Sequence, residues 1–64
     1  MINEYDKVKI RRNGIFGKVV DIHTANGETV FIVESSEKGV PGGYGPADGW
    51  KLFDCAEDEL EKID

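Results

Sequence analysis

Hydrophobic and polar residues alternate near the start of the chain. In the stretch YDKVKIRR, the apolar Val8 and Ile10 alternate with the basic Lys7, Lys9 and Arg11. A period of two is typical of a strand that has one buried face, because successive side chains of a strand point to opposite sides. The pattern predicts a first strand with a row of basic side chains on its outward face.

A second strand is predicted over IFGKVVDIHT, directly after the turn dipeptide Asn13-Gly14. Asn-Gly favours a type I′ hairpin turn, because both central residues of that turn have positive φ. Gly17 lies inside the strand and indicates a β-bulge or a close approach of another backbone. Val19 and Ile22 are three residues apart, so both can face the core only if the strand contains one extra residue.

Two further strands are predicted in the middle of the chain. A second Asn-Gly pair, Asn26-Gly27, predicts another tight hairpin turn before a third strand, ETVFIVES. Apolar residues occupy both faces of this strand, as expected where a small sheet curls over on itself. WKLFDC predicts a fourth strand with three candidate core residues, Trp50, Leu52 and Phe53, and its pattern leaves open which of them face inward.

The last segment predicts a short helical turn followed by a final strand. An acidic residue lies three positions after a possible N-cap at Asp54, which favours a helical turn over Ala56–Glu59. The stretch LEKI then predicts a last strand with Leu60 and Ile63 inward. A single helix over 55–63 is the alternative, because the same two residues also fit helical spacing.

Five short strands in 64 residues predict a single all-β domain over 1–64. We expect a small five-stranded barrel, closed or half-closed, with one helical turn before the last strand. Closure would remove the sheet edges that promote aggregation. The Gly/Pro-rich stretch 35–48 is expected to be the loop between the third and fourth strands, and no second domain is predicted.

Composition and charge narrow the class of protein. Hydrophobic residues make up 39% of the chain, charged residues 33%, and the net charge is −5, which disfavours nucleic acid or an anionic membrane as a partner. No apolar run approaches the ~20 residues of a membrane span. The first residues, MINEYDK, do not resemble a signal peptide. A single cysteine, Cys55, excludes an intrachain disulfide, so a cytoplasmic location is expected.

A family resemblance lies in the first half of the chain. The stretch Asp6–Ile10, followed by Gly14, Gly17 and the V-x-x-I spacing of Val19 and Ile22, resembles a KOW-type motif on an SH3-like barrel. The segment 50–63 resembles the closing part of such barrels. The similarity covers most of the chain except 35–48. Uncharacterised small acidic single-domain proteins of bacteria and their phages look similar.

The resemblance implies a fold and no single function, because SH3-like barrels bind RNA, bind peptides or dock enzyme subunits. The nucleic-acid-binding members tend to be basic, whereas this chain is acidic. The peptide-binding SH3 domains have an aromatic pair in an acidic first loop, whereas the first loop here is only Asn13-Gly14. The binding groove for proline-rich ligands therefore does not carry over.

No catalytic, cofactor-binding or metal-binding residues are predicted, and an enzyme is not expected. His23 and Cys55 supply two of the roughly four ligands that zinc requires. Acidic residues beside Cys55 oppose formation of a thiolate nucleophile. The segment Gly43–Gly49 lacks the Lys-Ser/Thr pair of a phosphate-binding loop. The acidic residues near the C-terminus are expected to form a solvated face.

The leading functional hypothesis is an interaction module that docks on a protein partner. Aromatic residues beside a flexible loop are common anchors of protein interfaces, and the loop 39–50 with its surroundings contains three candidates: Phe16, Tyr44 and Trp50. Core packing is the alternative for Trp50, and covering one mouth of the barrel is the alternative for Tyr44. Self-association is a third, plainer possibility.

The second functional hypothesis is weak binding of RNA or DNA. The candidate residues form a basic stripe on the first strand and around the first turn: Lys7, Lys9, Arg11, Arg12 and Lys18. The simpler interpretation is that outward strand residues are polar in any case and that lysine discourages edge pairing. Few phosphate contacts would make such binding weak and strongly dependent on salt.

Overall fold

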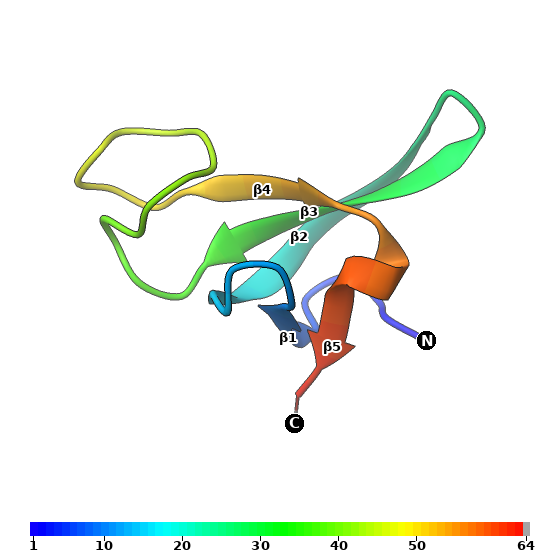
Figure 1. The fold of residues 1–64 in the computed structure, drawn as a ribbon. Helices are drawn as coiled ribbons and strands as arrows, with labels where there is room; N and C mark the ends of the chain where they lie inside the picture. The colour runs from blue at the N-terminus through cyan, green and yellow to red at the C-terminus, as the bar shows by residue number, and fades with distance from the viewer. Residues whose placement is uncertain (64) are drawn as a thin grey trace.

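The protein forms one antiparallel sheet of five strands in a computed structural model that describes residues 1–63 (Figure 1). The order across the sheet is β4-β3-β2-β1-β5. The five strands and the short 3-10 helix η1 between the last two are β1 (Lys7–Ile10), β2 (Phe16–Ala25), β3 (Glu28–Ser35), β4 (Leu52–Cys55), η1 (Glu57–Glu59) and β5 (Leu60–Lys62). The all-β class and the helical turn before the last strand are confirmed, and the alternative of one helix over 55–63 is wrong.

The sheet does not close into the expected barrel. Its two edges are β4 and β5, and no pairing joins these strands within residues 1–63. The three residues of β5 all pair with β1, while β4 pairs with β3 along its four residues. The short helix η1 joins the two edge strands across the open side of the sheet (Figure 1).

The core lies on one face of this curved sheet. The predicted alternation in β1 is confirmed, because Val8 and Ile10 are completely buried. Val19 of β2 and Val33 of β3 are also completely buried. The buried apolar side chains come from all five strands and from the N-terminal segment: Ile2, Val8, Ile10, Val19, Phe31, Val33, Phe53, Cys55 and Leu60.

The predicted bulge is present in β2. The register with β3 shifts between Val19 and Asp21, so that Val19 is buried and Ile22 packs against the core. Gly17 lies before the bulge and marks a close approach of two backbones. A Cβ at this position would lie 2.5 Å from the Glu34 carbonyl oxygen. The spacing of apolar residues therefore located the bulge correctly, and Gly17 has a separate role.

The two Asn-Gly pairs form different turns. Asn26 and Gly27 have φ of 53° and 77°, which confirms the type I′ turn of the β2–β3 hairpin, and this hairpin projects from the body of the domain (Figure 1). At the first pair only Gly14 has positive φ, and the type I′ prediction is wrong. The Asn13 side chain instead accepts a hydrogen bond from the Ile15 N–H at 3.0 Å, as in an Asx turn.

Candidate binding surface

The outer face of the sheet, turned away from the core, carries most of the candidate residues. Strand pairing sets Lys7 opposite Lys18, Lys18 opposite Glu34, and Glu34 opposite Leu52. Directly paired residues point to the same side of a sheet, so these four side chains form one row across β1 to β4. Phe16 belongs to the neighbouring row, opposite Lys9.

Trp50 lies on the surface, with 48% of its residue area exposed. The interpretation of Trp50 as a core residue is therefore wrong, whereas Phe53 is buried as expected and Leu52 is half-buried. The reason is the alternation along the segment, because Lys51, Phe53 and Cys55 occupy the inward positions. Phe16 is also 48% exposed, so two large aromatic rings remain accessible to a partner.

A lysine ammonium covers each of these two rings. The Lys9 Nζ lies 5.8 Å from the centroid of Phe16, and the Lys38 Nζ lies 5.3 Å from the centroid of Trp50. A cation–π contact at an exposed site contributes about 0.5–1 kcal/mol. Lys38 was not among the predicted residues, because no local pattern indicates that it lies over a ring twelve positions further along the chain.

A groove of about 350 Å³ lies between Trp50 and the row of charged residues. A smaller groove of about 180 Å³ lies beside Phe16, and Ser36 lines both. The Ser36 N–H donates a hydrogen bond of 2.9 Å to the Phe16 carbonyl oxygen, so the two aromatic residues lie on either side of the same short segment. The larger groove, called the lysine groove below, is lined among others by Lys7, Lys18, Glu34, Ser36, Trp50 and Ile63.

Tyr44 is exposed but is held against the edge of the sheet. Its N–H and carbonyl oxygen both bond to the backbone of Leu52, each at 2.9 Å. Its hydroxyl donates a hydrogen bond to the Asp54 carboxylate, which raises the pKa of the Tyr44 hydroxyl. Tyr44 does not line the lysine groove. It therefore anchors the β3–β4 loop along the outer edge of β4.

The β3–β4 loop is shaped by contacts with the two inward residues after Trp50. The buried Lys51 donates a hydrogen bond from Nζ to the Gly42 carbonyl oxygen at 3.0 Å. A Cβ on Gly43, whose φ is +65°, would lie 2.8 Å from the Phe53 ring. The glycines thus allow the backbone of the loop that leads to Trp50 to lie directly on Phe53.

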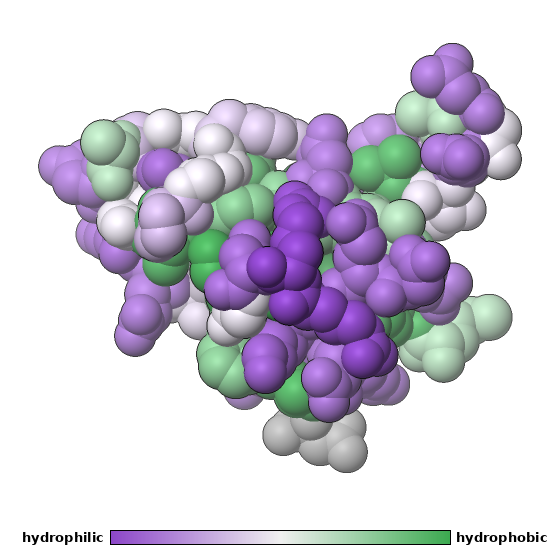
Figure 2. Space-filling view, viewed as in Figure 1, coloured by the Kyte–Doolittle hydropathy of each residue, from purple (hydrophilic) through white to green (hydrophobic). Residues whose placement is uncertain are grey.

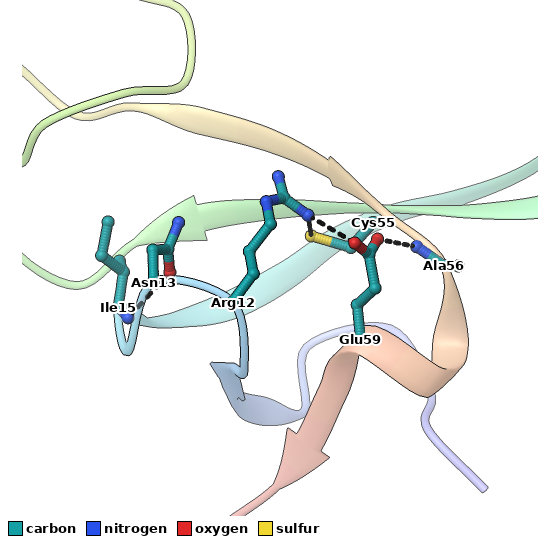
Figure 3. Close-up of polar contacts among 6 residues, drawn as sticks. All are labelled: Arg12, Asn13, Ile15, Cys55, Ala56 and Glu59. Atoms are coloured by element: carbon teal, nitrogen blue, oxygen red, sulfur yellow. Dashed lines mark hydrogen bonds and ion pairs between the residues drawn. The ribbon is translucent and has the colours of Figure 1, made fainter.

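The five predicted nucleic-acid-binding residues do not form one patch. Lys7, Lys9 and Lys18 share the outer face, as the register shows. Arg12 instead points across the open side of the sheet, where its Nη1 lies 2.9 Å from Glu59 Oε2 (Figure 3). Arg11 lies in the β1–β2 loop with its side chain exposed. In Figure 2 the most hydrophilic surface runs across this gap between the β1–β2 loop and η1.

Arg12 and Glu59 cover the single cysteine. Arg12 Nη1 also lies 3.9 Å from the Cys55 sulfur (Figure 3), and Cys55 is only 3% exposed. Burial raises the pKa of the Cys55 thiol, while Arg12 acts in the opposite direction. The Glu59 carboxylate also accepts the Ala56 N–H at 2.8 Å. The N-cap of the helical turn is therefore Ala56, two positions after the predicted Asp54.

We expect Glu59→Gln to destabilise the fold at neutral pH and to lose this effect in acid. The hydrogen bond from Ala56 lowers the pKa of the Glu59 carboxyl, and Arg12 adds to this shift. A carboxyl with a lowered pKa stabilises the fold above its unfolded pKa, and the stabilisation is lost as the pH falls through its folded pKa. The difference in free energy of unfolding between wild type and variant should therefore become smaller as the pH falls below 4.5, the usual pKa of a glutamate carboxyl.

Urea unfolding of both proteins between about pH 7 and about pH 3 measures this difference. Glu57→Gln is the matched control, because it removes an exposed acid from the same helical turn. A destabilisation by Glu59→Gln that stays constant over the whole pH range would contradict the assigned role of the carboxylate.

Within residues 1–63, no group of three or more His, Cys, Asp or Glu residues is arranged to hold a metal ion. The same part of the chain contains no helix that is long and apolar enough to cross a membrane. Comparison with protein families, with curated proteins and with solved structures found no match to this chain.

Proposed function

We propose that this protein is a small non-enzymatic module, located in the cytoplasm, that docks on a protein partner through its outer face. The observation that carries the proposal is the exposure of two aromatic rings beside two neighbouring grooves, with Trp50 at the lysine groove and Phe16 at the smaller one. Burying a large apolar side chain stabilises a fold by about 1.5–3 kcal/mol. This small domain forgoes about half of that stabilisation at two rings that are each 48% exposed, and exposed aromatic residues next to a groove are typical anchors of protein interfaces.

We also propose that the domain is a half-open member of the SH3-like class with a KOW-like first hairpin. Three observations support this assignment. The strand order places β5 beside β1, a 3-10 turn precedes the last strand, and the bulged second strand carries Gly17 at the close approach to β3. The class itself says nothing about the ligand, so the docking proposal depends on the outer face alone.

Trp50→Ala and Phe16→Ala should abolish capture of the partner while the fold remains intact. Truncation of an interface anchor typically reduces binding by about 2 kcal/mol or more, which is roughly thirty-fold. The measurement is capture of partners from a lysate of the source cells by the tagged protein, with circular dichroism to confirm the fold. Tyr5→Ala is the matched control, because Tyr5 is 67% exposed and lines neither of the two grooves.

Capture that is unchanged in both the Trp50 and the Phe16 variant would contradict the docking proposal.

Tyr44 has an indirect role in this proposal, since its backbone bonds to Leu52 hold the loop that leads to Trp50. Tyr44→Phe keeps the ring and removes only the hydrogen bond to Asp54. Because the bonds to Leu52 are made by the backbone and remain in any variant, we expect nearly unchanged capture from Tyr44→Phe and at most slightly weakened capture from Tyr44→Ala.

A second candidate function is binding of single-stranded RNA or DNA. It is favoured by the position of Lys7, Lys9 and Lys18 on the same face as two exposed aromatic rings, because bases stack on aromatic side chains while lysines contact phosphates. The net charge of −5 opposes this function. NMR titration of the protein with oligothymidine tests this candidate, and an absence of shifts at the three lysines would contradict it.

A further inference from the structure

The lysine groove contains two like charges in direct opposition. Lys7 and Lys18 form a cross-strand pair on β1 and β2, and like charges in this position destabilise a sheet. The three ion pairs within residues 1–63 use Arg12, His23 and Lys62 as cations. Neither groove lysine takes part in one of these ion pairs; Lys18 has Glu34 opposite it on β3, and Lys7 has no acid paired with it on β2.

The charge of the groove is opposite in sign to that of the whole protein. The chain has a net charge of −5, yet among the described residues Glu34 is the one acid that lines the groove beside the two lysines. Two further ammonium groups, from Lys9 and Lys38, lie over the neighbouring rings. Surface regions of one sign attract ligands of the other sign, so the groove is suited to an anionic ligand.

The groove also has apolar walls. Trp50 and Ile63 line it together with the lysines, and its volume of about 350 Å³ is near the lower end of the ~300–1,000 Å³ typical of ligand pockets. A space of this size accommodates a side chain rather than an extended polymer. The ligand that matches these walls carries an apolar group close to negative charge.

We infer that the lysine groove binds an acidic peptide segment of the partner, with one apolar side chain against Trp50 and flanking carboxylates on Lys7 and Lys18. This inference rests on the proposed docking function and names the chemistry of the partner. A nucleic acid fits less well, because a chain of phosphates requires a continuous track of cations. Here Glu34 interrupts the track, and the net negative charge of the protein repels a long polyanion.

The test is a titration of the ¹⁵N-labelled protein, followed by NMR, with a short synthetic peptide in which one leucine is flanked by glutamates. We expect shifts at Lys7, Lys18, Ser36 and the indole N–H of Trp50, and weaker binding as salt is raised. The same peptide with glutamine in place of glutamate is the uncharged control. Oligothymidine of equal charge is the nucleic-acid control.

Charge variants of the groove sharpen the test. Lys7→Gln and Lys18→Gln should each weaken binding of the acidic peptide by about three-fold, the effect of one partly exposed charge pair. Arg11→Gln removes the same charge from the exposed β1–β2 loop outside the groove and should leave binding nearly unchanged. Glu34→Gln removes the acid inside the groove and should strengthen binding, which a purely structural role of Glu34 does not predict.

The inference would be overturned by equal binding of the glutamine peptide, by tighter binding of oligothymidine, or by the absence of shifts at these residues at millimolar peptide. Shifts in the groove when the protein alone is concentrated would assign it to a second copy of the chain and would overturn it as well. If the acidic peptide does not bind but capture of the partner still depends on Trp50, the docking proposal stands and only the acidic chemistry of the ligand is rejected.

Discussion

Gly17→Ala should strongly destabilise the fold at room temperature. A Cβ on Gly17 would lie 2.5 Å from the Glu34 carbonyl oxygen and 2.6 Å from Val33 Cγ1, and Val33 is completely buried. Overpacking typically costs 1–3 kcal/mol, occasionally more. Here relief requires separation of β2 from β3 at the centre of the sheet, so we expect a loss of about 3 kcal/mol or more.

That loss is a large part of the total stability, because a domain of this length has roughly 3–10 kcal/mol in all. Urea unfolding followed by circular dichroism measures the effect. Two other glycines provide matched controls. In Gly27→Ala the new Cβ lies in open space, so the variant should be destabilised only by the backbone strain of φ +77°, about 1–2 kcal/mol. Gly49→Ala requires a shift of a few tenths of an ångström at Pro46. A Gly17→Ala variant as stable as the Gly49→Ala variant would contradict the close approach of the two strands.

Phe53→Ala should destabilise the protein by about 3–5 kcal/mol, the usual range for removal of a buried aromatic ring. Phe53 is 3% exposed, and its ring lies against Gly42 and Gly43 of the β3–β4 loop. The loop should therefore detach in the remaining folded molecules. Hydrogen exchange at the amides of Tyr44 and Leu52, which bond to each other's carbonyl groups, should become faster.

Phe16→Ala is the matched control, because it removes the same ring from a position that is 48% exposed. Its effect on stability should be only about 1–2 kcal/mol, since roughly half of the residue is exposed and the lost contacts are those of the buried half and of Lys9. If Phe53→Ala leaves too little folded protein, Gly43→Ala tests the same contact with the core intact, because its Cβ would collide with the Phe53 ring. Unchanged exchange at Tyr44 and Leu52 in a folded variant would contradict the role of Phe53 as support of the loop.

The sequence predicts the role of Gly17 in part and does not predict the role of Phe53 as support of the β3–β4 loop. Gly17 was expected to mark either a bulge or a close approach, because a glycine inside a strand has few other roles. Only the pairing of β2 with β3 separates the two roles, and it places the bulge between Val19 and Asp21. The support of the loop by Phe53 could not be predicted, because a glycine-rich segment has no apolar pattern that indicates what it packs against.

The candidate site was predicted in its parts and not in its arrangement. The exposed rings of Phe16 and Trp50 were named in advance as candidates for protein binding, and Lys7 and Lys18 as candidates for nucleic-acid binding. The structure brings all four together on one face. It also withdraws Arg12 from that surface, since its ion pair with Glu59 joins residues 47 positions apart. No local pattern contains such a contact.

By itself, the sequence determined the strands, the β2–β3 turn and the bulge, because each depends on interactions between residues close together in the chain. Alternation sets which side of a strand is buried, Asn-Gly sets a turn with positive φ, and a spacing of three between inward residues requires a bulge. Tertiary structure alone decided that the sheet stays open, that Trp50 faces outward and that the lysines line a groove. These features depend on which strands meet and on what covers each face, and distant parts of the chain settle both when they pack.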